Sequence, residues 1–231
     1  MAGEHESAAR EVNMCGRYKV STPGDELWET FDIHGEIPFD FRPRYNVAPT
    51  DRIAVMRKPH ELEFMRWGIK IPNPKAIGIN VRVESLNAPF YRDSINGRRC
   101  LVLADGYYEW KLIADGKKQP YLIKRADGRP FAFAGFWDRV TVKGADVEAA
   151  TILTTKPVGI AAEAHDRMPV ILPSNRLAQW LDPAARYRDL LVPDTDDLEL
   201  VPVSSLVNSV KNDVPECAVR VEPMAAASPS A

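Results

Sequence analysis

The sequence has few cysteines, no long apolar run and no strong excess of charge of either sign. Its 231 residues include three cysteines, Cys15, Cys100 and Cys217, an odd number at wide spacing. They form no Cys-x-x-Cys pair, so the pattern indicates neither a disulfide framework nor a cysteine zinc site. No stretch approaches the roughly 18–20 apolar residues of a membrane helix. The first residues lack the basic and apolar regions of a secretory signal, which favours a cytoplasmic protein.

The formal net charge is only −2, but the acidic side chains concentrate at the two ends of the chain. Residues 14–189 carry 27 basic and 22 acidic side chains, a net charge of +5. This mildly basic central region is compatible with binding to the phosphate backbone of a nucleic acid. Hydrophobic residues make up 45% of the chain, which is enough for a packed core.

Short apolar stretches between turn residues predict many strands and few helices. We expect strands over residues 17–20, 53–58, 62–67, 98–104, 107–112, 120–125, 131–137, 147–155, 168–172 and 199–204. Helices are expected over residues 23–32, 84–94, 158–164, 175–181 and 183–191, and an extended loop over 39–50. Cys100 lies in an apolar run and is expected to be a buried structural thiol, whereas Cys217 is expected near a frayed end.

The predicted fold class is α+β, a single domain with a curved, mostly antiparallel sheet or barrel-like core and peripheral helices. Residues 1–14 are expected to be a leader that is disordered or absent from the mature chain. The domain is expected over residues 15–223, followed by a disordered tail over 224–231.

Five short patterns follow one another along the chain. They are Met-Cys-Gly-Arg-Tyr at residues 14–18, Arg-Tyr-Asn-Val-Ala-Pro-Thr at 44–50, Asn-Val-Arg-Val-Glu at 80–84, Gly-Tyr-Tyr-Glu-Trp at 106–110 and His-Asp-Arg-Met-Pro at 165–169. In this order they resemble the SRAP family, the SOS response-associated peptidases or abasic-site processing proteins, from about Cys15 to Val203. The resemblance implies a DNA repair protein of the SOS response that binds single-stranded DNA and forms a covalent crosslink at abasic sites.

By this resemblance, Cys15 is the first residue of the mature chain. An opened abasic deoxyribose is an aldehyde, with which the α-amine of an N-terminal cysteine forms a Schiff base and its thiolate then closes a thiazolidine. An α-amine titrates at about 7.7–8.0, against about 10.4 for lysine, so more of it is nucleophilic at neutral pH. Because thirteen residues precede Met14, the chemistry requires translation from Met14 or removal of the leader. Without the other patterns, the preferred interpretation of Cys15 is a buried apolar residue at the start of a strand.

The resemblance also assigns catalytic roles to Asn80, Glu109 and His165. Strand alternation places Glu109 on the same face as Tyr107 and opposite to Trp110. A carboxylate among apolar side chains can have a raised pKa, and Glu109 is expected to transfer protons during sugar opening and Schiff-base formation. His165 is expected to protonate the sugar oxygen or stabilise an alkoxide, and Asn80 to hold the amine or the sugar. The residues alone also allow a surface glutamate, a structural histidine and a turn asparagine.

Several side chains within or near the patterns are candidates for DNA contact. Arginine suits bidentate phosphate contacts, and tryptophan offers a surface for base stacking. The candidates are Arg17, Asn46, Trp67, Arg82, Trp110, Arg167 and Met168, the last as an apolar wedge. No metal and no small-molecule cofactor are expected, and the chain is expected to be a monomer. Two alternatives stay open: a thiol peptidase that uses Cys15 and His165, including on its own leader, and a non-covalent single-stranded DNA-binding module.

Overall fold

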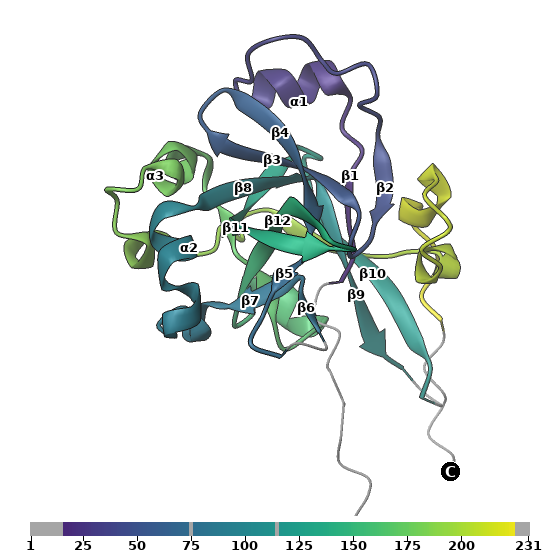
Figure 1. The fold of residues 1–231 in the computed structure, drawn as a ribbon. Coiled ribbons are helices and arrows are strands. Elements are labelled where there is room, and N and C mark those ends of the chain that lie inside the picture. Colours follow the sequence, from purple (N-terminus) through teal and green to yellow (C-terminus); the bar gives the residue numbers. More distant parts are fainter. Residues whose placement is uncertain (1–15, 74–75, 114–115, 225–231) are drawn as a thin grey trace, which may run out of the picture.

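The computed structural model describes residues 16–73, 76–113 and 116–224, in two large sheets joined by short helices (Figure 1). Cys15 and the predicted leader lie outside the described residues, as does the predicted tail except for Met224. The mixture of many strands with few short helices confirms the predicted α+β class. In the described part of the chain, no helix is long and apolar enough to cross a membrane.

Five strands of one sheet close into a barrel. Their order is β12, β4, β3, β8 and β11, and β11 pairs again with β12; all these pairs are antiparallel except β12–β4. The strands are β3 (Arg52–Lys58), β4 (Glu61–Trp67), β8 (Arg99–Ala104), β11 (Phe131–Val142) and β12 (Ala145–Thr155). Three short strands extend them: β7 (Asn80–Arg82) and β13 (Met168–Pro169) on β12, and β14 (Ile171–Leu172) on β11. The predicted barrel-like core is therefore confirmed.

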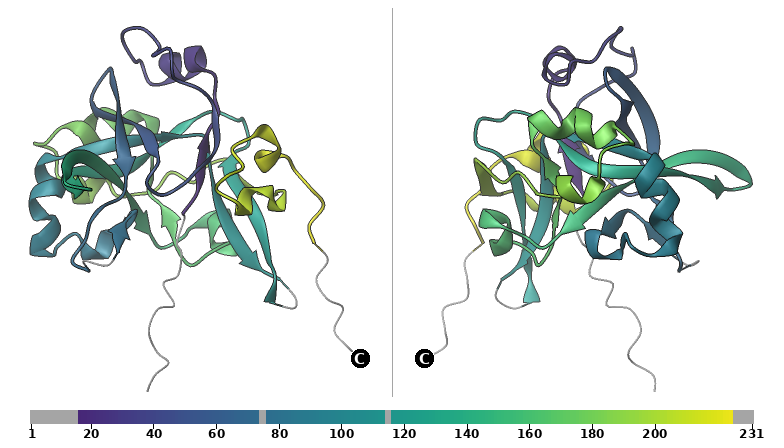
Figure 2. Two further views of the ribbon diagram at one scale, coloured as in Figure 1. Left: turned by 45° about the vertical axis from the view of Figure 1, so that its right-hand side comes forward. Right: turned by 90° about the vertical axis from the view of Figure 1, so that its left-hand side faces the viewer.

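The second sheet has five antiparallel strands and lies beside the barrel. Its order is β15 (Leu198–Pro202), β10 (Lys118–Arg125), β9 (Gly106–Leu112), β1 (Tyr18–Val20) and β2 (Arg44–Val47). The β9–β10 hairpin projects from the molecule, away from the side where α2 and α3 lie (Figures 1 and 2). A two-stranded ribbon, β5 (Ile69–Lys70) and β6 (Ile77–Gly78), leads into β7.

Aromatic side chains join the two sheets. The ring of Tyr18 on β1 meets the indole of Trp67 edge-on at 5.2 Å and the ring of Phe133 at 5.9 Å, and Tyr107 meets Phe133 at 6.1 Å. All four side chains are almost completely buried. Edge-to-face pairs of this kind add to the stabilisation from buried apolar area. Strand β1 is thereby packed onto the barrel by its own side chain.

The helices are shorter than the sequence predicts. They are α1 (Gly24–Thr30), α2 (Arg92–Gly97) and α3 (Leu177–Leu181), with 3-10 turns at Val83–Ser85, Pro89–Tyr91, Gly159–Glu163, Ser174–Arg176, Tyr187–Leu190, Ser205–Asn208 and Pro215–Ala218. The prediction of one helix over 84–94 is wrong. Pro89 forces Ala88 into an extended conformation (φ −62°, ψ 137°), which splits the segment into two 3-10 turns followed by α2.

Two segments expected to be irregular are ordered by contacts from distant parts of the chain. The predicted loop over 39–50 contains β2, because Asp213 accepts hydrogen bonds from the backbone N–H groups of Tyr45 and Asn46 (2.6 and 2.9 Å). Cys217 is completely buried in a second apolar cluster with Tyr108, so the expected frayed end is a packed segment. Cys100 is also buried, as predicted, and burial raises the pKa of its thiol.

A buried carboxylate fixes strand β1 against the end of β8. Asp105 is 3% exposed and accepts hydrogen bonds from the backbone N–H groups of Ser21 and Thr22 (both 2.6 Å) and from the Thr22 hydroxyl (2.8 Å). Its other oxygen accepts from Nζ of Lys19 at 2.6 Å. A charge taken out of water is stable only when it is satisfied in this way.

We expect Asp105→Ala to lower the free energy of unfolding by roughly 3 kcal/mol or more, since Lys19 and two backbone donors would stay buried without their acceptor. Urea denaturation measures this change. Asp146→Ala removes an exposed carboxylate of the β11–β12 hairpin and should change stability by no more than about 0.5 kcal/mol. Equal effects of the two substitutions would contradict the role of Asp105.

Candidate active site

The first described residues of the chain lie between β9 and the segment that enters β7. The backbone N–H of Tyr108 donates to the carbonyl of Arg17 at 3.0 Å, and Tyr18 is in register with Tyr107. Continuing this antiparallel register toward the N-terminus brings the chain alongside Glu109. A Cβ built on Gly16 would lie 3.8 Å from Cδ1 of Ile79, the residue before Asn80. The residue next to Cys15 is therefore close to two of the three predicted partners of that cysteine.

Trp67 holds the Asn80 segment in place. Its indole Nε1 donates to the carbonyl of Ile79 at 2.9 Å, and the same carbonyl accepts from the backbone N–H of Ile152 at 3.1 Å. Strand β7 then runs parallel to β12, with Asn80 opposite Ile152. Trp67, which the sequence predicts as a base-stacking surface, has no exposed area. Its polar and apolar atoms are both used to position β7 and β1.

Glu109 lies on β9, between β1 and β10, opposite Tyr121. Its side chain is 2% exposed, which excludes the surface glutamate that the residue type alone allowed. The predicted alternation is confirmed, because Tyr107 belongs to the main core whereas Tyr108 and Trp110 pack in the second cluster. A nearly buried carboxylate at this position is suited to exchanging a proton with a reacting group.

His165 follows the 3-10 turn Gly159–Glu163 and precedes β13. The backbone N–H of Arg167 lies 3.1 Å from its Nδ1, and the same nitrogen lies 2.8 Å from Oδ1 of Asp166. Burial lowers the pKa of His165 below 6.5; the nearby Asp166 raises it and Lys118 lowers it. At neutral pH the imidazole is therefore uncharged. Lys118 lies on β10, and nothing in the sequence pattern indicated its proximity.

An ion pair joins two of the five patterns. Arg167 is 8% exposed and donates to both oxygens of Glu84, each at 2.8 Å, and to the carbonyl of Thr154 at 2.6 Å. The hydrogen bonds from Arg167 lower the pKa of Glu84. Arg167 was predicted as a phosphate contact, but its guanidinium is occupied by this bidentate pair. Glu84 was missed as a functional residue, although it stands four positions after Asn80 in the same pattern.

A second polar cluster involves Arg17 and Asn46. Nη1 of Arg17 donates to Oδ1 of Asn46 and to the carbonyl of Val207, both at 2.9 Å. The Asn46 amide in turn donates to the carbonyls of Val207, Ser209 and Asn212. Asn46, which the sequence predicts as a DNA contact, is buried, and its amide is hydrogen-bonded within the protein. It fixes the segment after β15 against β2.

The remaining predicted contacts differ in exposure. Met168 is completely buried and its sulfur accepts from the backbone N–H of Val158 at 3.4 Å, so it is not an exposed wedge. Arg82 is exposed at the end of β7. Trp110 is half-buried near the projecting end of β9, and its Nε1 donates to Oδ1 of Asn208 at 2.7 Å. Arg82 and Trp110 are therefore available at the surface beside Asn80 and Glu109.

We expect the His165 ring to titrate below 6.5 and its neutral form to stabilise the fold. Between its lowered pKa and 6.5 the unfolded chain binds more protons, so this contribution is complete above about pH 6.5 and is lost as the pH falls through that window. An NMR titration of the ring protons measures the midpoint. Asp166→Asn should lower the midpoint further, because Asp166 favours the cation. A wild-type midpoint at or above 6.5 would refute the burial argument.

Glu84→Gln should weaken the bidentate interaction with Arg167. The Glu84 side chain is 49% exposed, so we expect a loss of roughly 1 kcal/mol of stability rather than the larger loss typical of a fully buried pair. The His165 ring signals should shift as well, since Arg167 contacts that ring through its backbone. Urea denaturation and NMR test both effects. Glu163→Gln, which removes an exposed carboxylate two residues before His165, is the control and should cause neither the loss of stability nor the shift of the ring signals. A loss above about 3 kcal/mol in Glu84→Gln would contradict the solvent screening of the ion pair.

Comparison with known proteins gives one consistent family. The model of the SOS response associated peptidase (SRAP) family matches residues 14–210. The chain is 39% identical over 219 residues to abasic site processing protein YoqW of Bacillus subtilis (strain 168), covering 88% of this chain and 98% of that protein. It is 31% identical over 216 residues to abasic site processing protein YedK of Escherichia coli (strain K12), covering 86% and 96%.

Solved structures share the fold. A protein from Bacteroides thetaiotaomicron superposes with a TM-score of 0.76 at 21% identity, covering 90% of this chain and 100% of that chain. A protein from Bordetella bronchiseptica superposes with a TM-score of 0.68 at 27% identity, covering 82% and 100%.

Proposed function

Because the chain belongs to the SOS response associated peptidase (SRAP) family, we propose that it captures abasic sites in single-stranded DNA as a covalent adduct of Cys15. The observation that carries the proposal is the position of Gly16, between Ile79 and the strand that bears Glu109. The names of the relatives YoqW and YedK, which describe abasic site processing, support the same substrate.

The proposed reaction uses both nucleophiles of an N-terminal cysteine. The α-amine attacks the aldehyde carbon of the opened deoxyribose, and loss of one water gives a Schiff base. The thiolate then adds to the imine carbon and the nitrogen takes up a proton, which closes a five-membered thiazolidine. The net change is condensation of one aldehyde with one aminothiol and release of one water, and no cofactor is required.

Glu109 and His165 are proposed to move the protons. Glu109, nearly buried beside the start of β1, is placed to accept a proton from the attacking amine and to return it to the leaving hydroxyl. The neutral His165 is proposed to donate a ring N–H to the ring oxygen of the sugar as the ring opens. Asn80, fixed at the end of the Trp67-bound segment, is proposed to hold the amine or the sugar through its amide.

The exposed side chains around this site are proposed to bind the single-stranded DNA. Arg82 at the end of β7 offers a phosphate contact, and the half-buried Trp110 on β9 offers an indole face for a neighbouring base. Arg17 is half-buried and already bound to Asn46, so its proposed part is to fix the entry to β1. Binding that depends on few phosphate contacts should show only a modest salt dependence.

The family description includes the word peptidase, which favours self-removal of the leader as a second activity. The family match begins at Met14, directly before Cys15. A peptidase step would need only the thiol of Cys15 as nucleophile and His165 as base, whereas the crosslink needs a free α-amine as well. Blocking the amine therefore separates the two functions.

We expect a chain that starts at Cys15 to form a covalent complex with a single-stranded oligonucleotide carrying one abasic site. On a denaturing gel, the shifted band should be lost in Cys15→Ala and after acetylation of the α-amine. The matched control retains residues 1–14 uncleaved. Its Cys15 has the same thiol, but the nitrogen of Cys15 is in a peptide bond, so this chain should form no band. Cys217→Ala, which removes a buried thiol, should leave the band unchanged.

The other outcomes identify the alternatives. A band that persists after acetylation would contradict thiazolidine formation. If a chain that starts at an acetylated Cys15 removes the leader from a second chain that still carries it, this would support a peptidase. Retention of the oligonucleotide on a native gel with no covalent band from the chain starting at Cys15 would support a non-covalent binding module.

Glu109→Gln should slow capture without abolishing DNA binding. General acid–base catalysis contributes typically about 10²–10⁴-fold, so the single-turnover rate should fall at least roughly 100-fold while the Kd for undamaged single-stranded DNA stays the same. Rapid quenching followed by gel analysis measures the rate. Glu199→Gln, on β15 of the same sheet, is the control and should react at the wild-type rate. An unchanged rate in Glu109→Gln would exclude it as the proton-transfer group.

A further inference from the structure

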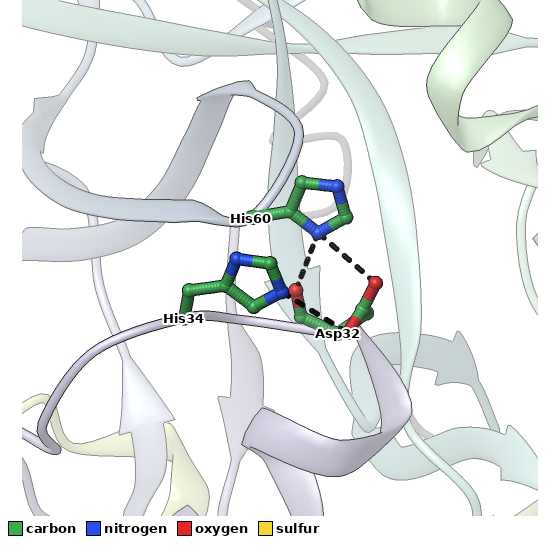
Figure 3. Close-up of side chains that lie close together, drawn as sticks. All are labelled: Asp32, His34 and His60. Atoms are coloured by element: carbon green, nitrogen blue, oxygen red, sulfur yellow. Dashed lines mark hydrogen bonds and ion pairs between the residues drawn. The ribbon is translucent and has the colours of Figure 1, made fainter.

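A cluster of potential metal ligands, apart from the candidate active site, lies after the end of α1 and at the turn between β3 and β4. It consists of Asp32, His34 and His60, and the ligand atoms of the three side chains all lie within 4.8 Å of one another (Figure 3). Two of the four histidines in the chain therefore meet at one place, from separate segments. In Figure 1, α1 lies at the end of the molecule opposite to β7 and the tip of β9, so the cluster is separate from the candidate active site.

The backbone around the cluster is fixed on both sides. The N–H of His34 donates to the carbonyl of His60 at 2.9 Å, which ties the loop after α1 to the hairpin turn. The N–H of Ile33 donates to the carbonyl of Trp28 at 2.9 Å. Phe31 and Ile33, which flank Asp32, are both buried in the main core. The loop therefore presents its polar side chains from an anchored backbone.

The side chains face one another with their donor atoms. Nδ1 of His60 lies 2.8 Å from the carbonyl oxygen of Asp32 and 3.0 Å from its Oδ2, and Nε2 of His34 lies 3.4 Å from Oδ1. Both close neighbours of His60 Nδ1 are acceptors, so this nitrogen carries the proton. The two imidazole rings are stacked, with centroids 4.2 Å apart and planes 7° apart.

We propose that Asp32, His34 and His60 bind one divalent zinc-type metal ion. Zinc takes imidazole nitrogen and carboxylate oxygen at about 2.0–2.2 Å, and three protein ligands leave its fourth position to water. On binding, the proton of His60 moves from Nδ1 to Nε2, and Nδ1 exchanges the Asp32 carbonyl for the metal. Because an imidazole binds a metal in the plane of its ring, one of the two stacked rings must turn out of the stack. The His34, Asp32 and His60 side chains are 68%, 74% and 45% exposed, so they are free to make this rotation.

The bound ion would add a link between two parts of the chain that are already joined by the backbone hydrogen bond between His34 and His60. One part is the segment that leads from α1 towards β2, and the other is the β3–β4 turn of the barrel. Because the metal binds the folded cluster and not the separated ligands of the unfolded chain, it should raise the melting temperature by an amount that grows with the logarithm of its affinity. It should have no effect on capture chemistry, which uses other residues.

Isothermal titration of the full chain with Zn²⁺ tests the proposal. Three variants remove one ligand each: Asp32→Asn, His34→Gln and His60→Asn. Asparagine is chosen at positions 32 and 60 because both residues have positive φ (49° and 66°), a conformation that asparagine tolerates. Each substitution should lower the Zn²⁺ affinity of one site at least about tenfold and abolish the rise in melting temperature that Zn²⁺ causes.

Glu61→Gln is the matched control, since it removes a carboxylate next to His60 that is not part of the cluster. It should leave the Zn²⁺ affinity and the melting temperature shift unchanged. Sites at Cys15, His5 or His165 are present in every variant and so do not contribute to the difference. Unchanged affinity in all three ligand variants, or an equal loss in Glu61→Gln, would overturn the proposal.

Discussion

The buried carboxylate of Asp105 is the interaction on which the geometry of the candidate active site depends. It receives two backbone N–H groups, a hydroxyl and the Lys19 ammonium, and all of them belong to β1 or the residues directly after it. Strand β1 has only three residues, too few to hold its register by ladder hydrogen bonds alone. The carboxylate at one end, and the contacts of Tyr18 with Trp67 and Phe133 in the middle, fix the position of β1 and of Gly16 just before it.

On the other side of the site, single buried side chains likewise position more than one segment. Trp67 supports β1 through its ring and β7 through its indole N–H, so one buried side chain positions two segments that are far apart in the sequence. Arg167 performs the corresponding task for β12, the Glu84 turn and, through its backbone, the His165 ring. The family patterns therefore contain two kinds of residue, those proposed to react and those that hold the reacting groups in register.

The sequence predicted the class of fold and most strands, because alternating apolar residues between turn signals report directly on half-buried strands. It placed Glu109 and Tyr107 on one face for the same reason. It did not distinguish buried from exposed members of the patterns: Trp67, Met168 and Asn46 were expected at the surface and are buried, since their partners come from distant segments. Pro89 did signal the break in the predicted helix over 84–94, because proline disfavours a helical conformation of the residue before it. Residue type could not reveal that Asp213 contacts β2 from the other end of the chain.

The central claim concerns the α-amine of Cys15 as much as its thiol, and mass spectrometry tests it most directly. The covalent complex of the chain starting at Cys15 with an abasic oligonucleotide should have the summed mass of the two less one water. Digestion should place the adduct on Cys15, and treatment with borohydride should leave its mass unchanged, because a thiazolidine has no imine to reduce. An adduct on a lysine, or a mass that gains two hydrogens on reduction, would contradict the account.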